Sequence, residues 1–155
     1  MASAPRSLAL ALASGLALAL TGLTASASAA STHTLKLHGT MMATHSTAAA
    51  VITQTSAADY KITITTSNLP APAMIHVKGG AMMRVYIAWA SDGNRMSDMD
   101  MAAPIALHAT RAGTYTGTRV VMLRQVARVF VTAEGSAMKH TPSMGSAVLD
   151  SGMMH

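Results

Sequence analysis

The sequence contains no cysteine. A chain without cysteine has no disulfide to stabilise it and no thiolate with which to hold a metal. A blue-copper electron-transfer site requires a cysteine ligand, so that class is excluded, and the lack of thiolates disfavours a structural zinc site. The stability of the folded chain must therefore come from a packed apolar core.

Aromatic and charged residues are also scarce, at 3% and 11% of the 155 residues. The net charge is +5, but the basic side chains are scattered, and the nearest group, formed by Arg119, Arg124 and Arg128, has no aromatic platform beside it. Nucleic-acid-binding surfaces combine a basic stripe with rings on which bases stack. We therefore expect no nucleic-acid partner.

Motifs of hydrolytic and phosphate-binding enzymes are missing as well. The chain has no Gly-x-Ser-x-Gly elbow, no His-Glu-x-x-His helix and no phosphate loop. Glu134 is its only glutamate, and the aspartates mostly lie in predicted turns, where local hydrogen bonding favours them. We expect a protein that is not an enzyme; the remaining enzymatic alternative is a Ser/His/Asp group assembled only by the fold.

Charge is nearly absent from residues 1–30, where Arg6 is the only charged side chain. Residues 8–20 form an apolar run shorter than the ~20 residues of a membrane-spanning helix, and residues 25–30 are small. This pattern predicts a secretory signal peptide over residues 1–30, with an uncleaved anchor as the alternative. The cleavage positions that fit are Ala27, Ala29 and Ala30. We expect an exported protein (periplasmic, cell-surface or secreted) without a membrane span after cleavage.

The rest of the chain consists of short segments that alternate between apolar and polar residues. In residues 59–67, Tyr60, Ile62 and Ile64 share one face. The strongest strand signal is residues 83–89, where apolar residues also recur with period two. The predicted strands are 34–38, 48–55, 59–67, 83–89, 104–108, 113–118, 127–133 and 146–149, and residues 120–126 are expected to include one helical turn.

Seven to eight short strands separated by turns predict an all-β domain over residues 31–150. We expect a single antiparallel β-sandwich of immunoglobulin-like type, followed by a flexible Met/His tail at residues 151–155.

Four short motifs in the second half are similar to those of a known family. They are Val-Tyr-Ile-Ala-Trp at 85–89, Asp-Gly at 92–93, Val-Thr-Ala-Glu at 131–134, and Thr-Pro-Ser-Met-Gly-Ser-Ala-Val-Leu at 141–149, which is followed by Gly152. This half resembles the extracytoplasmic C-terminal domain of anti-sigma-K-type anti-sigma factors. The resemblance implies a sandwich fold and an exported location. It does not imply the regulatory activity, because no sigma-binding domain is found before the apolar run, and the family pattern does not include the methionines.

Methionine and histidine are in excess, with 14 and 7 residues in the chain. Methionine fills gaps in cores, so Met83 and Met122, on predicted strand faces, are expected to be buried. Most of the others lie in predicted loops, where packing does not account for them. Thioethers are soft neutral donors that select Cu(I), and imidazole binds Cu(I) or Cu(II). The loops therefore indicate a soft-metal site.

Alternating strand directions would place every second connection at the same end of the domain. We call the end with the connections after the first, third, fifth and seventh strands the first pole; there His108 is expected to end the fifth strand. The candidate ligands at the first pole are Met41, Met42, His45, Met74, His76, Met138, His140 and Met144. Those at the second pole are Met96, Met99, Met101, Met153, Met154 and His155. The first pole is the preferred site because more histidines are predicted to converge there.

The functional hypothesis is an exported protein that binds Cu(I) or a related soft metal as a carrier, buffer or sensor. CopC-like periplasmic copper carriers use Met- and His-rich loops in a similar manner, which is an analogy. One alternative is a structural or interaction module that binds an exported protein and no metal. Another is an oxidant scavenger, because exposed methionines take up oxidant as sulfoxide and can be reduced again.

Overall fold

The computed structural model describes residues 30–93, 95, 98 and 101–152. The predicted signal peptide lies outside the described residues except for Ala30, as do the candidate ligands Met96, Met99, Met153, Met154 and His155. Within the described part, no helix is both long enough and apolar enough to cross a membrane.

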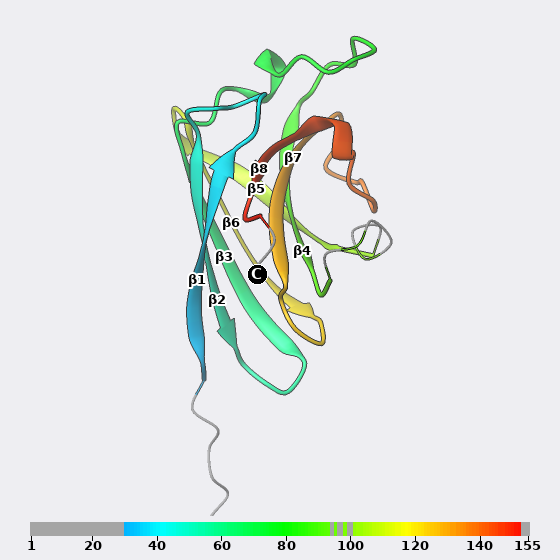
Figure 1. Cartoon of the computed structure of the whole chain (residues 1–155). Coiled ribbons are helices and arrows are strands. Elements are labelled where there is room, and N and C mark those ends of the chain that lie inside the picture. Colours follow the sequence, from blue (N-terminus) through cyan, green and yellow to red (C-terminus); the bar gives the residue numbers. More distant parts are fainter. Residues whose placement is uncertain (1–29, 94, 96–97, 99–100, 153–155) are drawn as a thin grey trace, which may run out of the picture.

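Eight strands and two short 3₁₀ helices make up the described chain (Figure 1). The strands are β1 (Thr32–Gly39), β2 (Thr47–Gln54), β3 (Asp59–Ser67), β4 (Val85–Ser91), β5 (Ala103–Arg111), β6 (Thr114–Met122), β7 (Arg128–Glu134) and β8 (Ala147–Asp150). The helices are η1 (Pro72–Met74) and η2 (Met144–Ser146). The predicted all-β class and the eight strands are confirmed. The helical turn predicted within residues 120–126 is wrong, because β6 continues as a strand to Met122 and residues 123–127 are irregular.

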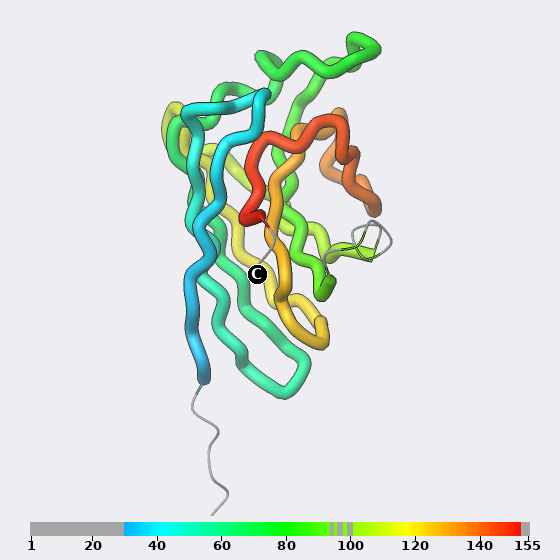
Figure 2. Tube along the Cα trace, viewed as in Figure 1, coloured from blue at the N-terminus to red at the C-terminus, as the bar shows by residue number. Residues whose placement is uncertain are grey.

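The strands form one closed sheet in the order β1-β2-β3-β6-β5-β4-β7-β8, whereas the sequence predicted two layers of an immunoglobulin-like sandwich. The difference comes from β8, which pairs with β7 on one side and with β1 on the other and so joins the ends of the sheet. In Figure 2, β8 (red) lies between β1 (blue to cyan) and β7 (orange). Every pairing is antiparallel, so the connections after β1, β3, β5 and β7 share the first pole, as the alternation predicted.

Few residue pairs close the ring, because β8 has only four residues. It meets β1 at two positions, where His38 pairs with Asp150 and Gly39 with Leu149. The pairing of β1 with β2 directs the backbone groups of every second residue away from β2. At Thr32, Thr34 and Lys36 these groups face no strand among the described residues, so most of β1 has a free edge.

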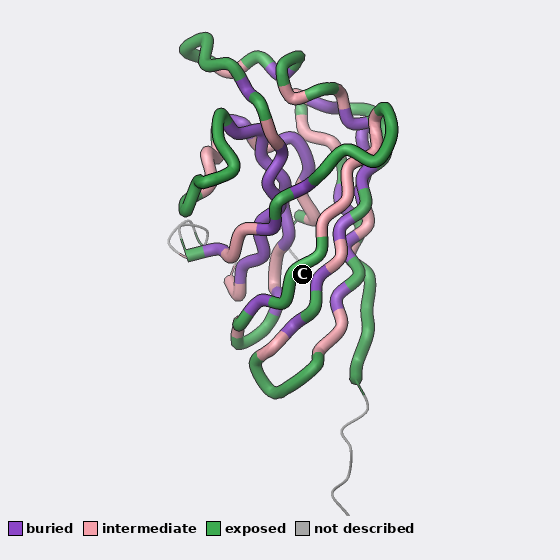
Figure 3. Tube along the Cα trace, turned by 180° about the vertical axis from the view of Figure 1, so that it is seen from behind, coloured by how far each residue is buried: buried purple, intermediate pink, exposed green. Residues whose placement is uncertain are grey.

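The interior of the barrel is a packed apolar core. Figure 3 marks the buried residues along the chain in purple. In β3 the predicted alternation is confirmed, because Tyr60, Ile62 and Ile64 are buried while Lys61 and Thr65 are exposed. Each strand with this pattern contributes one face to the core and the other to solvent.

Two neighbouring strands, β4 and β7, are buried on both faces. Their inward residues join the main core, while Ile87, Trp89 and Phe130 form a second cluster on the outer face. Ala102 is buried in this cluster, and Met144 packs against it from the β7–β8 loop. A single buried face was expected for residues 83–89, but loops cover the second face as well.

Candidate functional site

The β1–β2 loop, at the first pole, depends on glycine at position 39. A Cβ atom added to Gly39 would lie 1.9 Å from the carbonyl oxygen of Ala43, so the tight approach of the two backbones requires glycine. Thr40 fixes the same end of the loop, because its hydroxyl donates to the carbonyl oxygen of Ala147 at 2.6 Å. The loop is therefore attached to β8 where it begins.

The other end of the loop is held by Ser46. Its backbone N–H donates to the carbonyl oxygen of Ala43 at 2.9 Å, and its hydroxyl donates to the carbonyl oxygen of Asn68 at 2.7 Å. Ser46 is 2% exposed, so both hydrogen bonds are shielded from water. These contacts fix the loop against the start of the β3–β4 connection.

Between these two anchors lies a hollow of about 250 Å³, lined by residues 41–46, Asn68 and Pro70. We call it the first-pole hollow. Three predicted ligands line it: Met41, Met42 and His45. Met41 is 97% exposed, His45 is exposed, and Met42 packs in part against the core. The hollow is thus lined by two residues that carry a thioether and one that carries an imidazole.

The other five predicted first-pole ligands do not line this hollow. Met74 and His76 are exposed on the β3–β4 connection, which projects from the top of the barrel in Figure 1. Met138 and His140 are exposed on the β7–β8 loop, and Met144 packs against the Trp89 cluster. The eight residues therefore do not line one hollow.

His108 was expected to end a strand at the first pole. It lies within β5, which continues to Arg111, and it is exposed and paired with Thr116 of β6. Its place on the outer surface of the sheet separates it from the loops.

At the second pole, the structure corrects the prediction for Met122. Met83 is in the core at 6% exposure, as expected, but Met122 is 79% exposed. Successive side chains of a strand point to opposite faces, and in β6 it is Val121 that points inward. Met122 therefore lies on the outer surface, where Met101 is also 83% exposed.

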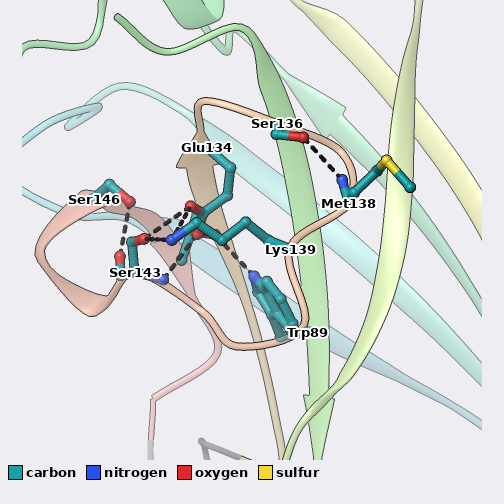
Figure 4. Close-up of polar contacts among 8 residues, drawn as sticks. Trp89, Glu134, Ser136, Met138, Lys139, Ser143 and Ser146 are labelled. Atoms are coloured by element: carbon teal, nitrogen blue, oxygen red, sulfur yellow. Dashed lines mark hydrogen bonds and ion pairs between the residues drawn. The ribbon is translucent and has the colours of Figure 1, made fainter. Parts of the chain in front are cut away.

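Buried polar contacts fix the β7–β8 loop to the sheet (Figure 4). Glu134 is 1% exposed, and its Oε1 accepts hydrogen bonds from the Thr132 hydroxyl at 2.7 Å and from the Ser143 N–H at 2.8 Å. Its Oε2 accepts from the Ser143 hydroxyl at 2.8 Å and lies 3.8 Å from Nζ of Lys139. Trp89 donates its indole N–H to Thr132 at 2.8 Å, which links the network to β4.

This network, which we call the Glu134 clamp, sets where Met138 and His140 lie, because both are carried by the clamped loop. Sequence reasoning treated Glu134 only as the end of a strand. The available signal was the occurrence of the single glutamate after an apolar strand, where a charge requires hydrogen-bonding partners.

Tyr86 is hydrogen-bonded to Pro70, which lines the first-pole hollow. Its hydroxyl donates to the carbonyl oxygen of Pro70 at 2.7 Å, and its ring meets that of Tyr115 edge-on at 4.9 Å. Burial, and next the neighbouring Tyr115, raise the pKa of Tyr86 well above its ordinary value. At neutral pH this phenol is protonated and is not available as a phenolate ligand.

Within the described ranges, no three side chains of the His, Asp and Glu types lie close enough together to hold a metal ion. Comparison with protein-family models, with curated proteins and with solved structures gives no match to this chain.

Proposed function

We propose that this protein binds Cu(I), or a related soft ion such as Ag(I), in the first-pole hollow. The observation that carries the proposal is the convergence of Met41, Met42 and His45 on one hollow of about 250 Å³. Thioether and imidazole form a neutral, soft donor set that suits Cu(I). An exported carrier, buffer or sensor without catalytic activity is the function that this set would serve.

The exposure of Met41 supports a role other than packing. Burying a side chain of this size stabilises a fold by about 1.5–3 kcal/mol, and at 97% exposure Met41 gains almost none of that. Two anchored loop ends nevertheless hold its backbone in place. A bound soft metal would account for a rigid loop that carries an exposed thioether.

The chemistry of the lining also favours a soft ion over a hard one. Calcium and magnesium prefer several oxygen ligands, usually including carboxylates. Among the described residues, neither Asp nor Glu lines the first-pole hollow, where the side-chain oxygens belong to Thr44, Ser46 and Asn68. A monovalent soft ion does not require a carboxylate to balance its charge.

The test is titration of the protein with Cu(I) in the presence of a competing chelator. We expect binding tighter than micromolar, and a loss of at least tenfold in affinity for Met41→Leu/Met42→Leu. The matched control is Met74→Leu/Met82→Leu, which alters two exposed methionines of the β3–β4 connection and should leave the affinity unchanged. Wild-type binding weaker than micromolar, or an equal loss in the control, would rule the proposal out.

The pH dependence separates the two kinds of donor. Imidazole must be neutral to bind a metal, whereas thioethers do not titrate. Because one imidazole binds one competing proton, acidification from pH 7 to pH 5 lowers the affinity by at most about 100-fold, the factor by which the proton concentration rises. His45→Ala should bind more weakly at pH 7 and lose this pH dependence, and a steeper fall in the wild type would contradict a methionine-dominated site.

A second candidate function is the scavenging of oxidants by surface methionines. It is favoured by the exposure of Met41, Met101, Met122 and Met138, each at least 79% exposed. This function needs no ligand geometry, so it predicts that wild-type protein consumes oxidant but binds Cu(I) no better than the Met41→Leu/Met42→Leu variant.

A further inference from the structure

Met101 and Met122 both lie at the second pole, at the opposite end of the barrel from the first-pole hollow. Both line a hollow of about 340 Å³, together with Ala58, Asp92, Leu123 and Arg124. We call it the second-pole hollow. The two methionines reach it from different segments, one just before β5 and the other at the end of β6.

Hydrogen bonds tie the walls of the second-pole hollow together. The N–H of Leu123 donates to the carbonyl oxygen of Ala58 at 2.9 Å, which joins the end of β6 to the β2–β3 turn. Gln125 donates its side-chain amide to the carbonyl oxygen of Asp92 at 3.1 Å, which joins the next residues to the end of β4. These hydrogen bonds join three of the four chain segments that line the hollow, and the fourth, which carries Met101, leads directly into β5.

The two thioethers are not explained by packing. Met101 and Met122 are 83% and 79% exposed, so neither side chain contributes to the core. A polar residue at either position would leave the core intact. Among the described residues that line the hollow, the one carboxylate is that of Asp92 and the one cationic side chain is that of Arg124. The negative charge of Asp92 and the positive charge of Arg124 offset one another. The thioethers therefore determine which kind of ion the hollow prefers.

We propose that Met101 and Met122 form a second binding site for a soft monovalent ion, Ag(I) or Cu(I), with the Asp92 carboxylate as an additional oxygen donor. Two thioethers from separate segments can clamp one such ion, and thioether sulfur prefers it to the harder divalent metals. The site is independent of the first-pole hollow. The nine residues of β6 span roughly 25–30 Å, so one ion cannot contact both poles.

The experiment uses Ag(I) as the probe and protein labelled with ¹³C at the methionine methyl groups. Each methyl resonance reports its own thioether, and Met→Leu variants assign the peaks. We expect stoichiometric Ag(I) to shift the resonances of both Met101 and Met122 in the wild type. In Met122→Leu the Met101 resonance should lose its shift, while those of Met41 and Met42 respond as before.

The matched control is Met82→Leu, which removes a methionine of similar exposure (69%) from the β3–β4 connection. This control should leave the Met101 and Met122 shifts unchanged. In a separate calorimetric titration, Met101→Leu/Met122→Leu should bind one Ag(I) fewer than the wild type. An unshifted Met101 in the wild type, or an undiminished Met101 shift in Met122→Leu, would overturn the second site. Either result leaves the first-pole site intact, because that site is read from the Met41 and Met42 resonances.

Discussion

Glu134 is a charged side chain at a position where charge is costly. At 1% exposure its carboxylate is stabilised by donors from Thr132 and Ser143 and by the nearby ammonium of Lys139. Such a group stabilises a structure only while its partners are present, because an unpaired buried donor or acceptor is unfavourable. The Glu134 clamp therefore couples the position of the β7–β8 loop to the stability of β7.

Replacing Glu134 with Gln tests this coupling. The amide keeps the shape but loses the charge and one acceptor, so we expect the free energy of unfolding to fall by about 1–3 kcal/mol. The measurement is urea denaturation at neutral pH. As a control, Ser136→Ala removes the exposed hydroxyl that accepts the Met138 N–H, which should change stability by less than about 0.5 kcal/mol. Equal stabilities of the two variants would contradict the clamp.

Tyr86 provides the second prediction at this scale, a loss of stability in alkali. The folded state raises the pKa of Tyr86, so above pH ~10 the folded chain retains a proton that the unfolded chain releases. The contribution of this phenol to stability is therefore complete below pH ~10 and declines as the pH rises further. Urea denaturation from pH 8 to pH 11 should show the decline.

Tyr86→Phe should lose about 1 kcal/mol at neutral pH, because the hydrogen bond to Pro70 is absent, and should show a smaller alkaline decline. Tyr60→Phe is the matched control, because the Tyr60 hydroxyl also donates to a backbone carbonyl, that of Arg124. That control should retain the alkaline decline of the wild type. If Tyr86→Phe lost as much stability in alkali as the wild type does, Tyr86 would not be the group responsible for the decline.

At the scale of the elements, the free edge of β1 gives a prediction for hydrogen exchange. The N–H groups of Thr34 and Lys36 point away from β2 and face no described strand, whereas those of Leu35 and Leu37 point toward β2. An unpaired amide exchanges without unfolding, whereas a paired one waits for an opening event. We expect exchange at Thr34 and Lys36 to be at least about a hundredfold faster than at Leu35 and Leu37, measured by NMR. Uniform protection along β1 would contradict a free edge.

The strands could be predicted from the sequence because alternation is a local property. The bounds predicted for β3 match the structure, and the doubly buried strands β4 and β7 were found because apolar residues dominate them. Strand order could not be predicted in this way. Ring closure depends on β8 pairing with β1, more than a hundred residues earlier in the chain, and no local pattern encodes that pairing.

The candidate site was predictable only in part, for a similar reason. Strand direction determines the pole at which each loop lies, but packing determines where the side chains of the loop go. Met144, for example, packs against the Trp89 cluster and does not line the hollow with Met41. The position of Met122 was misread because Val120, Val121 and Met122 are all apolar, so the pattern does not show which of them points inward. The structure resolves this, with Val121 at 4% exposure.

At the scale of the whole molecule, the methionines divide into buried and accessible groups. Mild treatment with hydrogen peroxide should oxidise Met41, Met101, Met122 and Met138 well before Met83, which is 6% exposed. Because the exposed side chains contribute little to the core, the oxidised protein should retain its circular-dichroism spectrum. Peptide mass spectrometry measures the order of oxidation, and early oxidation of Met83 would be inconsistent with the described core.

The short strand β8 also affects how the molecule can be made. A ring of strands is complete only when its last member is in place, and here that member is the last of the eight to leave the ribosome. Until residues 147–150 emerge, β1 and β7 each lack a neighbour at the seam, and partly folded chains expose strand edges that can pair with other chains. Chains truncated before residue 147 should therefore be captured by chaperones or aggregate, whereas chains that include residues 147–150 can close the barrel.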